Sequence, residues 1–349
     1  MKKYIIIYGT RPEQIKLQPI IDEFKANNVP HEVICTCQQI ISCPPDVKLL
    51  PLVKTSSSAF RQGQIMERLH VHLDNSLVKG IIVQGDTLSA YCGALYGFLE
   101  GIPVYHVEAG LRTYDLTSPY PEECFRQQIA KMTSYHFAPT KKAYKCLLKE
   151  GFSKKNVFLT GNTIVDAIKS IPTNVTKEKK EILITCHRKE NIEYLQDIVE
   201  TINYLVEEYP EITFTWIKHQ NPNINKIVEE SLEKATNLNY IKALPYSEML
   251  QRLKNAYLVL TDSGGIQEEV ALMKVPTFVL RTTTERKESL KTGACKLIGV
   301  NPFKITKSVE DFIAGKLQFK IKDCTLYGKG SPTKEIVNII LEKEKIHDQ

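Results

Sequence analysis

The sequence lacks the segments that membrane, fibrous and disordered proteins require. No apolar run approaches the ~20 residues of a membrane-spanning helix. No low-complexity segment and no short-period repeat is present. The start of the chain resembles a signal peptide, but the apolar stretch is too short and Arg11 and Glu13 follow it. With 349 residues, 42% hydrophobic and 25% charged, the chain is typical of a globular protein of about two domains.

Two nucleotide-binding signatures are also missing. No G-x-G-x-x-G follows the first apolar run, which disfavours an NAD-binding domain, and no G-x-x-x-x-G-K-[ST] is present, which disfavours a P-loop nucleotidase. The nine cysteines include no C-x-x-C and stand singly, which indicates reduced thiols and a cytoplasmic protein. The net charge of +6 is small and spread along the chain, so we expect no nucleic-acid partner and no membrane partner.

Short apolar runs alternate with helical patterns along the whole chain. The runs are continuous rather than alternating, which is typical of parallel strands buried on both faces. The pattern therefore predicts an α/β fold of two Rossmann-like, doubly wound domains that face a cleft. Strands are expected at 4–8, 32–36, 80–84, 103–107, 135–138, 157–159, 182–185, 213–217, 240–243, 257–261 and 277–280, and helices at 15–25, 60–77, 89–99, 122–132, 192–208 and 266–272.

One segment interrupts this alternation. Residues 170–181 carry Pro172 and a run of charge without periodicity, which predicts an interdomain linker. We therefore expect an N-terminal domain at 1–170 and a C-terminal domain at 181–333. The last helix, expected at 334–349, has an apolar side and is predicted to pack back on the N-terminal domain. Ligands of such folds bind at the carboxyl ends of the strands.

The turn after the first strand carries more than a helix cap. Thr10 and Glu13 have the spacing of a capping box. A cap does not explain Arg11 and Lys16, two cations near the start of the same helix. Cations beside a helix N-terminus suit a phosphate or a carboxylate, so these two residues are candidate ligand contacts.

Carboxylates follow three further strands or loops of the first half. Asp86 comes directly after a strand, where it is either a functional acid or only an N-cap. Glu108 lies in a glycine turn at a strand end, where a buried carboxylate needs a partner or a function. Glu122 and Glu123 open a helix that continues to Arg126, and acids there are also ordinary partners of the helix dipole.

Histidine spacing does not support a metal site. His106 and Glu108 alternate on a strand and are expected to point to opposite faces. His70 and His72 lie on a helical pattern, where residues two apart diverge. We therefore expect no metal ligands.

The second half has two candidate anion-binding turns. His187 ends its first strand, where a histidine can bind or shuttle protons. Ser263, Gly264 and Gly265 stand between a strand and a helix, and bare backbone N–H groups there suit a diphosphate. A carboxylate one turn into that helix suits ribose hydroxyls.

The motifs around these residues resemble one known family. GTRPEQIKLQP, QGDT, HVEAGLRT, SPYPEE, HRKEN, DSGGIQEE and TTERKE occur, from about Lys3 to Gly330, in the order seen in the non-hydrolysing UDP-N-acetylglucosamine 2-epimerases. That family is similar in fold to GT-B glycosyltransferases. The resemblance implies interconversion of UDP-N-acetylglucosamine and UDP-N-acetylmannosamine, by elimination of UDP to a bound 2-acetamidoglucal and re-addition. It implies no cofactor, neither NAD nor a metal, and a homodimer.

The resemblance also assigns roles to individual residues. It implies that the catalytic residues are Asp86, Glu108, Glu122 and His187, the last of them near the diphosphate. The Ser-Gly-Gly turn is implied to hold the phosphates. The substrate-binding residues that it implies are Arg11, Lys16, Met249, Ser263, Gly264, Gly265, Glu269 and Arg286.

One stretch departs from the family pattern and leaves alternatives open. Common members read close to TGQHREM after the second strand, whereas in residues 36–42 of this chain Gln38 fits the pattern but the His, Arg and Glu are gone. In bacterial members this stretch helps to bind an activating UDP-N-acetylglucosamine, so either activation is lost or the sugar differs, as a 2,3-diacetamido uronic acid or a 6-deoxy amino sugar. A hydrolysing relative is disfavoured by Gly9–Glu13, and a non-catalytic sensor or glycosyltransferase by the retained acids.

Overall fold

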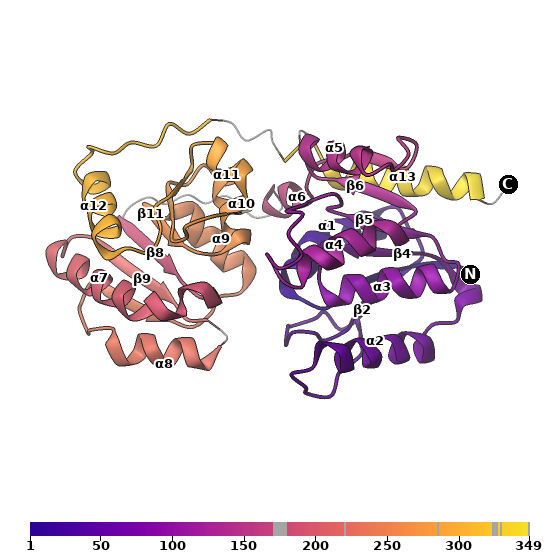
Figure 1. The fold of residues 1–349 in the computed structure, drawn as a ribbon, viewed down its shortest axis with the longest axis horizontal. Coiled ribbons are helices and arrows are strands. Elements are labelled where there is room, and N and C mark those ends of the chain that lie inside the picture. Colours follow the sequence, from indigo (N-terminus) through magenta and orange to yellow (C-terminus); the bar gives the residue numbers. More distant parts are fainter. Residues whose placement is uncertain (170–179, 220, 285, 323–326, 329, 348–349) are drawn as a thin grey trace. The chain divides into compact units, whose positions relative to one another are not determined.

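Two separate units make up the computed structural model, which describes residues 1–169, 180–219, 221–284, 286–322, 327–328 and 330–347 (Figure 1). Unit 1 comprises Met1–Ala167 and Thr325–Gln349, and unit 2 comprises Ile168–Cys324. The segment after Cys324 thus returns to unit 1, where the carbonyl of Tyr327 accepts a hydrogen bond from Asn162 N at 2.8 Å. The sequence pattern predicts the end of the second domain at 333. The linker expected at 170–181 lies almost wholly outside the described residues.

Unit 1 is built on a parallel sheet in the order β3-β2-β1-β4-β5-β6-β7. Consecutive side chains of β1 point to opposite faces, and both faces are buried, which explains the unbroken apolar run in the sequence. The strands are β1 Lys3–Tyr8, β2 His31–Cys35, β3 Lys48–Leu49, β4 Val78–Gln84, β5 Val104–Val107, β6 Tyr135–Ala138 and β7 Val157–Leu159.

Helices cover both faces of this sheet. Tyr4 and Ile6 share a buried cluster with apolar residues of α1 and α13, whereas Ile5 and Ile7 share another with residues of α2 and α3. The C-terminal helix α13 therefore packs on the unit that contains the N-terminus (Figure 1). The helices are α1 Arg11–Ala26, α2 Ser58–His72, the 3-10 turn η1 Asn75–Leu77, α3 Leu88–Leu99, α4 Glu122–Met132, α5 Lys141–Lys149, α6 Ile164–Lys169 and α13 Pro332–His347.

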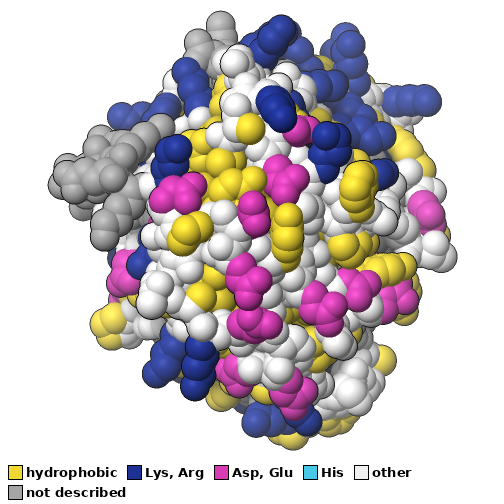
Figure 2. Space-filling model, turned by 90° about the vertical axis from the view of Figure 1, so that its left-hand side faces the viewer, with side chains coloured by type: hydrophobic (Ala, Val, Ile, Leu, Met, Phe, Trp, Pro, Cys, Tyr) yellow, Lys and Arg dark blue, Asp and Glu magenta, His cyan; other side chains and the backbone are white. Residues whose placement is uncertain are grey.

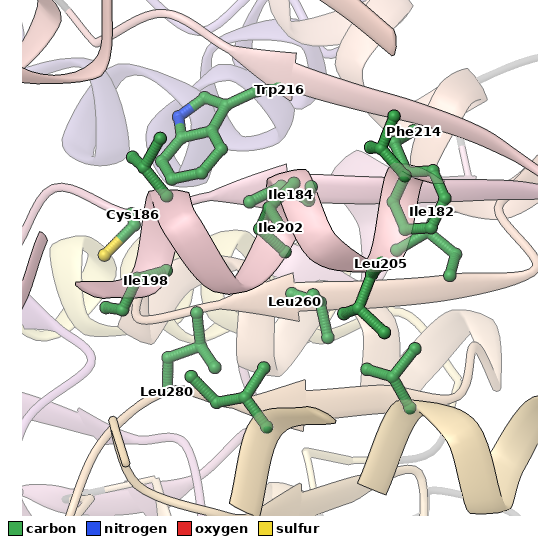
Figure 3. Close-up of a cluster of buried hydrophobic side chains, with 14 of the residues drawn as sticks. Ile182, Ile184, Cys186, Ile198, Ile202, Leu205, Phe214, Trp216, Leu260 and Leu280 are labelled. Carbon is green, nitrogen blue, oxygen red and sulfur yellow. The ribbon is translucent and has the colours of Figure 1, made fainter. Parts of the chain in front are cut away.

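Unit 2 repeats the design with a sheet in the order β10-β9-β8-β11-β12-β13. Ile182 and Ile184 of β8 pack with Trp216 and with the apolar faces of α7 and α12 (Figure 3). The strands are β8 Glu181–Thr185, β9 Thr213–Ile217, β10 Leu238–Ile241, β11 Leu258–Thr261, β12 Thr277–Val279 and β13 Cys295–Leu297. The helices are η2 Lys189–Tyr194, α7 Leu195–Glu208, α8 Pro222–Ser231, α9 Tyr246–Asn255, α10 Gly264–Met273, α11 Lys287–Lys291 and α12 Pro302–Ile313.

Two expected helices include a separate 3-10 turn in the structure. The helix expected at 60–77 ends at His72, because Leu73 is extended and Asp74 caps a separate 3-10 turn with its carboxylate. The helix expected at 192–208 begins at Leu195, after the 3-10 turn η2. In both cases a short 3-10 segment continues the helical spacing of apolar residues without being part of the helix.

The surface carries both signs of charge. On the face shown in Figure 2, Asp and Glu side chains run across the middle, and Lys and Arg gather chiefly along the upper edge. This face is therefore not a single basic surface. No helix among the described residues is long and apolar enough to cross a membrane.

Candidate functional site

Each sheet has one point where its strand order reverses. The reversal falls between β1 and β4 in unit 1 and between β8 and β11 in unit 2. In open parallel sheets, ligands bind at the carboxyl ends of the strands beside this point. The turns that leave these four strands carry most of the residues singled out in the sequence, so each unit contributes its own candidate cluster.

Glu13 joins the two turns at the switch point of unit 1. Its Oε2 accepts hydrogen bonds from Gly9 N at 3.0 Å, Thr10 N at 2.9 Å and Thr10 Oγ1 at 2.8 Å, which completes the expected capping box. Its Oε1 accepts from Thr87 Oγ1 at 2.6 Å, in the turn after β4. Burial raises the pKa of Glu13 to about 7, although these hydrogen bonds oppose the shift. The sequence predicted only the cap, whereas the carboxylate fixes both turns.

The space around Gly9 explains why a glycine stands there. A Cβ atom at this position would lie 1.9 Å from Ser89 Oγ and 2.3 Å from Thr36 Oγ1. Arg11 follows two residues later and is the half-buried first residue of α1. The same tight turn therefore sets the position of its backbone.

Lys16 and Glu108 form a buried ion pair. Lys16 Nζ lies 2.5 Å from Glu108 Oε2, and both side chains are more than nine-tenths buried. Asn162 Nδ2 donates to the same oxygen at 3.0 Å. Glu108 has a positive φ of 64°, an unfavourable backbone conformation for glutamate that is typical of functional sites. Lys16, expected as a substrate contact, is thus the counter-ion of a candidate catalytic acid.

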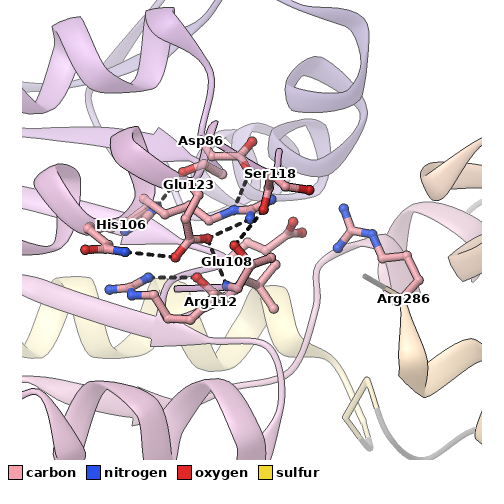
Figure 4. A network of polar contacts seen from close by, with 12 residues as sticks. Asp86, His106, Glu108, Arg112, Ser118, Glu123 and Arg286 are labelled. Atoms are coloured by element: carbon pink, nitrogen blue, oxygen red, sulfur yellow. Dashed lines mark hydrogen bonds and ion pairs between the residues drawn. The ribbon is translucent and has the colours of Figure 1, made fainter. Parts of the chain in front are cut away.

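Asp86 stands in the turn after β4 and is paired with Arg126 of α4. Arg126 Nε lies 2.6 Å from Asp86 Oδ2, and the same guanidinium contacts Glu123 (Figure 4). The same turn is held by His106, whose Nε2 donates to the carbonyl of Gly85 at 2.7 Å. The proton is assigned to Nε2 because a carbonyl oxygen can only accept. Burial lowers the pKa of His106 to about 4, so the ring is neutral and supports the turn that carries Asp86.

The adjacent acids Glu122 and Glu123 have different surroundings. Glu122 is half-buried as the first residue of α4. Glu123 is wholly buried and accepts hydrogen bonds from the backbone N–H groups of Thr113 and Tyr114, both at 3.0 Å. Glu123 therefore fixes the start of the loop before α4, and Glu122 is left as the candidate catalytic acid.

Asp262 is the centre of the cluster in unit 2. It is wholly buried directly after β11, and its Oδ2 accepts from His187 N and Arg188 N at 2.8 Å and from Asn191 Nδ2 at 3.0 Å. Cys186 Sγ also donates to this oxygen at 3.3 Å. One carboxylate thus holds the turn after β8 against the turn after β11.

His187 is oriented by this carboxylate and by a second histidine. Its Nδ1 lies 3.4 Å from Asp262 Oδ1, and its ring stacks on His219 with centroids 4.7 Å apart. Burial lowers the pKa of His187, although Asp262 opposes the shift. The neutral ring can accept or donate one hydrogen bond beside an anion.

The turn after β11 presents bare backbone at the start of α10. Ser263 is the N-cap residue, Gly264 and Gly265 form the first turn, and a Cβ at Gly265 would meet no atom within 4 Å. A helix N-terminus with this clearance can take a phosphate, because its N–H groups and its dipole both favour an anion.

Buried acids follow on the same helix. Glu268 is buried and lies 2.8 Å from Arg286 Nη1, and Gln267 Oε1 accepts from Thr284 Oγ1 at 2.8 Å. These contacts fix the segment that carries Arg286 to α10. Glu269, the expected ribose ligand, is the next buried carboxylate.

Met249 lies on α9 and is half-buried. It packs against the apolar cluster that contains Leu250, Leu253 and Val270. Its expected contact with a base therefore rests on the part of the side chain that this cluster leaves accessible.

Three residues of these clusters had no role in the sequence analysis. Arg126 pairs with Asp86, Asn162 orients Glu108, and Asp262 organises His187. Two of them had a signal in the sequence, since Arg126 follows the two acids of α4 at helical spacing and Asp262 stands in the DSGGIQEE motif. Among the described residues, no group of three or more His, Cys, Asp or Glu side chains is placed to hold a metal ion.

The fold and the two clusters of polar residues identify the general class of protein. Two doubly wound parallel α/β units, with acids at one switch point and an anion-binding helix start at the other, form a GT-B-like, nucleotide-sugar type of protein, as expected. The glycotransferase of kitacinnamycin, at 11% identity and a TM-score of 0.56 over 99% of this chain and 96% of that chain, shares this fold and supports nothing further.

Comparison of the whole chain then gives the family. A family model described as UDP-N-acetylglucosamine 2-epimerase matches residues 26–341. The UDP-N-acetylglucosamine 2-epimerase of Salmonella borreze is 33% identical over 99% of this chain and 100% of its own length. The structure of UDP-GlcNAc 2-epimerase from Neisseria meningitidis bound to UDP-GlcNAc is 32% identical, with a TM-score of 0.88 over 97% of this chain and 100% of that chain. The chain belongs to the UDP-N-acetylglucosamine 2-epimerase family, which confirms the resemblance and makes it a member of an isomerase family.

Proposed function

We propose that this chain interconverts UDP-N-acetylglucosamine and UDP-N-acetylmannosamine by epimerisation at C2. The observation that carries the proposal is the carboxylate cluster of unit 1, in which Asp86 and Glu108 are each held by a buried cation. Unit 2 adds an anion-binding helix start at Ser263. The relative from Neisseria meningitidis is described as bound to UDP-GlcNAc, which supports the same substrate here.

The proposed chemistry is an elimination followed by an addition. A carboxylate takes the C2 proton, the C1–O bond to UDP breaks, and a C1–C2 double bond forms in the bound 2-acetamidoglucal. Return of a proton to the opposite face of C2 and of UDP to C1 completes the epimerisation without net oxidation. Asp86, Glu108 and Glu122 are the candidate acids and bases, because positioned carboxylates transfer protons and stabilise oxocarbenium-like character at C1.

Unit 2 is proposed to hold UDP throughout. The backbone N–H groups of Gly264 and Gly265 suit the diphosphate, whose negative charge grows as the C1–O bond breaks. His187 and Arg286 add polar donors, with Glu269 for the ribose and Met249 against the base. Arg11 is proposed to bind the substrate from unit 1.

A deuterium-incorporation experiment tests the function. The purified chain is incubated with UDP-N-acetylglucosamine in deuterium oxide, and products are followed by nuclear magnetic resonance. We expect deuterium at C2 and the manno epimer, with both lost in Glu108→Gln. The absence of deuterium and of epimer with any UDP-2-acetamido sugar would refute the proposal. Free N-acetylmannosamine as the main product would instead identify a hydrolysing enzyme.

A modified UDP-sugar is the second candidate substrate. The stretch 36–42 lacks the usual His, Arg and Glu, and Cys37 within it has a positive φ of 56°. We therefore include a UDP-linked 2,3-diacetamido uronic acid and a UDP-linked 6-deoxy amino sugar in the same assay. A kcat/KM for either that exceeds that for UDP-N-acetylglucosamine would select it.

We further propose that the enzyme works as a homodimer in the cytoplasm and serves polysaccharide biosynthesis. The eight described cysteines are all free thiols, which supports a reducing compartment. Light scattering of the purified chain tests the oligomeric state.

A further inference from the structure

Arg126 lies between two carboxylates that have different exposure. Its Nε is 2.6 Å from Asp86 Oδ2, and its Nη1 is 3.1 Å from Glu123 Oε2. The Asp86 side chain is 24% exposed, whereas that of Glu123 is wholly buried. The guanidinium thus contacts a wholly buried carboxylate through one nitrogen and, through another, a partly exposed carboxylate in the turn after β4. Figure 4 labels these two carboxylates, Glu123 and Asp86.

Glu123 is a firm anchor because its own position is determined several times. It accepts hydrogen bonds from Thr113 N, Tyr114 N and Gln127 Nε2, all at 3.0 Å, besides the contact with Arg126. Burial alone would raise the pKa of Glu123, but the hydrogen bonds outweigh it and lower the pKa below its ordinary value. Glu123 therefore stays ionised and keeps Arg126 in place.

Asp86 needs such a partner. It follows Gly85, which has a positive φ of 71°, in a turn between β4 and α3, and its carboxylate is held by Arg126 from a different helix. Without the guanidinium, two carboxylates that now share it would repel each other, and Asp86 would turn away. A displacement of about 1 Å in a reacting group costs on the order of 100-fold in rate.

We infer that Arg126 is a positioning residue, whose guanidinium, anchored on Glu123, holds the Asp86 carboxylate in the orientation that the C2 chemistry requires. The inference rests on the proposed 2-epimerase function. Arg126 acts through Asp86 and makes no contribution to substrate affinity of its own.

The test is a double-mutant cycle on epimerisation of UDP-N-acetylglucosamine, with Arg126→Lys and Asp86→Asn alone and together. Enzyme is used at concentrations near that of the substrate, so that slow turnover stays measurable. Arg126→Lys is expected to lower kcat about 10- to 100-fold with KM changed less than about 3-fold. In the Asp86→Asn background the same substitution is expected to lower kcat less than about 3-fold, because its target is gone.

A matched control separates this role from simple stabilisation. Arg112 is another arginine of unit 1 with a buried side chain, paired through Nε and Nη2 with Glu150 at 2.8 and 2.9 Å. Arg112→Lys is expected to lower Tm as Arg126→Lys does, with kcat unchanged within about 3-fold, because its loss costs stability alone. If Arg126→Lys does not fold, Arg126→Gln combined with Glu123→Gln removes one charge of each sign and carries the same expectation.

Three results would overturn the inference in an active wild-type enzyme. They are a kcat of Arg126→Lys equal to that of Arg112→Lys, a raised KM with unchanged kcat, and losses that multiply in the Asp86→Asn background. An inactive wild-type enzyme would refute the proposed function instead, so the two failures are distinguishable.

Discussion

Replacement of Asp262 by alanine tests whether one buried carboxylate holds the candidate cluster of unit 2 together. Asp262 Oδ2 accepts from three N–H groups, those of His187 N, Arg188 N and Asn191 Nδ2. Asn191 is buried, and its Nδ2 keeps a second hydrogen bond to Leu280 O at 2.9 Å. Alanine removes the acceptor of these three donors and offers no other hydrogen-bond acceptor in its side chain.

The expected cost follows from those contacts. Each donor that loses its partner costs about 1–3 kcal/mol, and the half-buried turn at His187 regains some hydrogen bonds from water. The sum for Asp262→Ala is therefore about 3–4 kcal/mol of the free energy of unfolding of unit 2. Asp262→Asn keeps one acceptor oxygen in place and is expected to cost about 1–2 kcal/mol.

The single tryptophan makes this measurable in one unit. Trp216 is the only tryptophan of the chain and is buried in the core of unit 2, so its fluorescence reports the unfolding of that unit in urea. With a slope of about 2 kcal/mol/M, Asp262→Ala is expected to lower the midpoint by about 1.5–2 M. Glu207→Ala, at an exposed position of α7, is the control. A midpoint shift no larger than that of the control would refute the central role of Asp262.

Three further changes have defined outcomes. Glu108→Gln removes the negative charge opposite Lys16 and a candidate proton-transfer group, and is expected to lower kcat of the proposed reaction at least about 100-fold; steady-state epimerisation measures it. Burial lowers the pKa of His136 to about 3. As the pH falls, this histidine therefore takes up a proton in the unfolded chain before it does so in the folded chain. Its contribution to stability is retained above about pH 6.5 and lost below it. His136→Phe is expected to remove about 2 kcal/mol of the loss between about pH 7 and about pH 5, measured by urea unfolding of unit 1 with circular dichroism, and an unchanged pH dependence would contradict it. Gly9→Ala places a Cβ 1.9 Å from Ser89 Oγ and is expected to lower Tm by several degrees, whereas an unchanged Tm would show that the turn adapts.

Eleven of the thirteen strands in the described residues were predictable, because burial on both faces leaves a direct mark on the sequence; β3 and β13 were not predicted, and the strand expected at 240–243 lies at Leu238–Ile241. A strand such as β1 is an unbroken apolar run, and the polar residues that follow it identify the ligand-binding edge. The short edge strand β3 has two exposed residues, Lys48 and Leu49, and so leaves no such mark. Edge strands of this kind are recognised only from their pairing, here with β2.

The partners of the site residues were not predictable, because they come from distant segments. Arg126 lies 40 residues from Asp86, and Asn162 lies 54 residues from Glu108. Sequence spacing identifies neighbours on one helix or strand, but contact between two elements depends on the strand order of the sheet. The division of labour between Glu122 and Glu123 has the same origin, since a step of one residue on α4 turns a side chain by about 100°.

The return of the chain to unit 1 after Cys324 has a consequence for the order of folding during synthesis. Unit 2 is complete in sequence once residue 324 has left the ribosome, whereas unit 1 still lacks α13, which covers one face of its sheet through Ile336, Val337 and Ile340. Domains generally fold as units as the chain emerges, so the second unit can finish while the first still exposes an apolar surface. Unit 1, with the candidate catalytic acids, is therefore the last to complete its fold, and unit 2, with the candidate phosphate-binding turn, can fold before it.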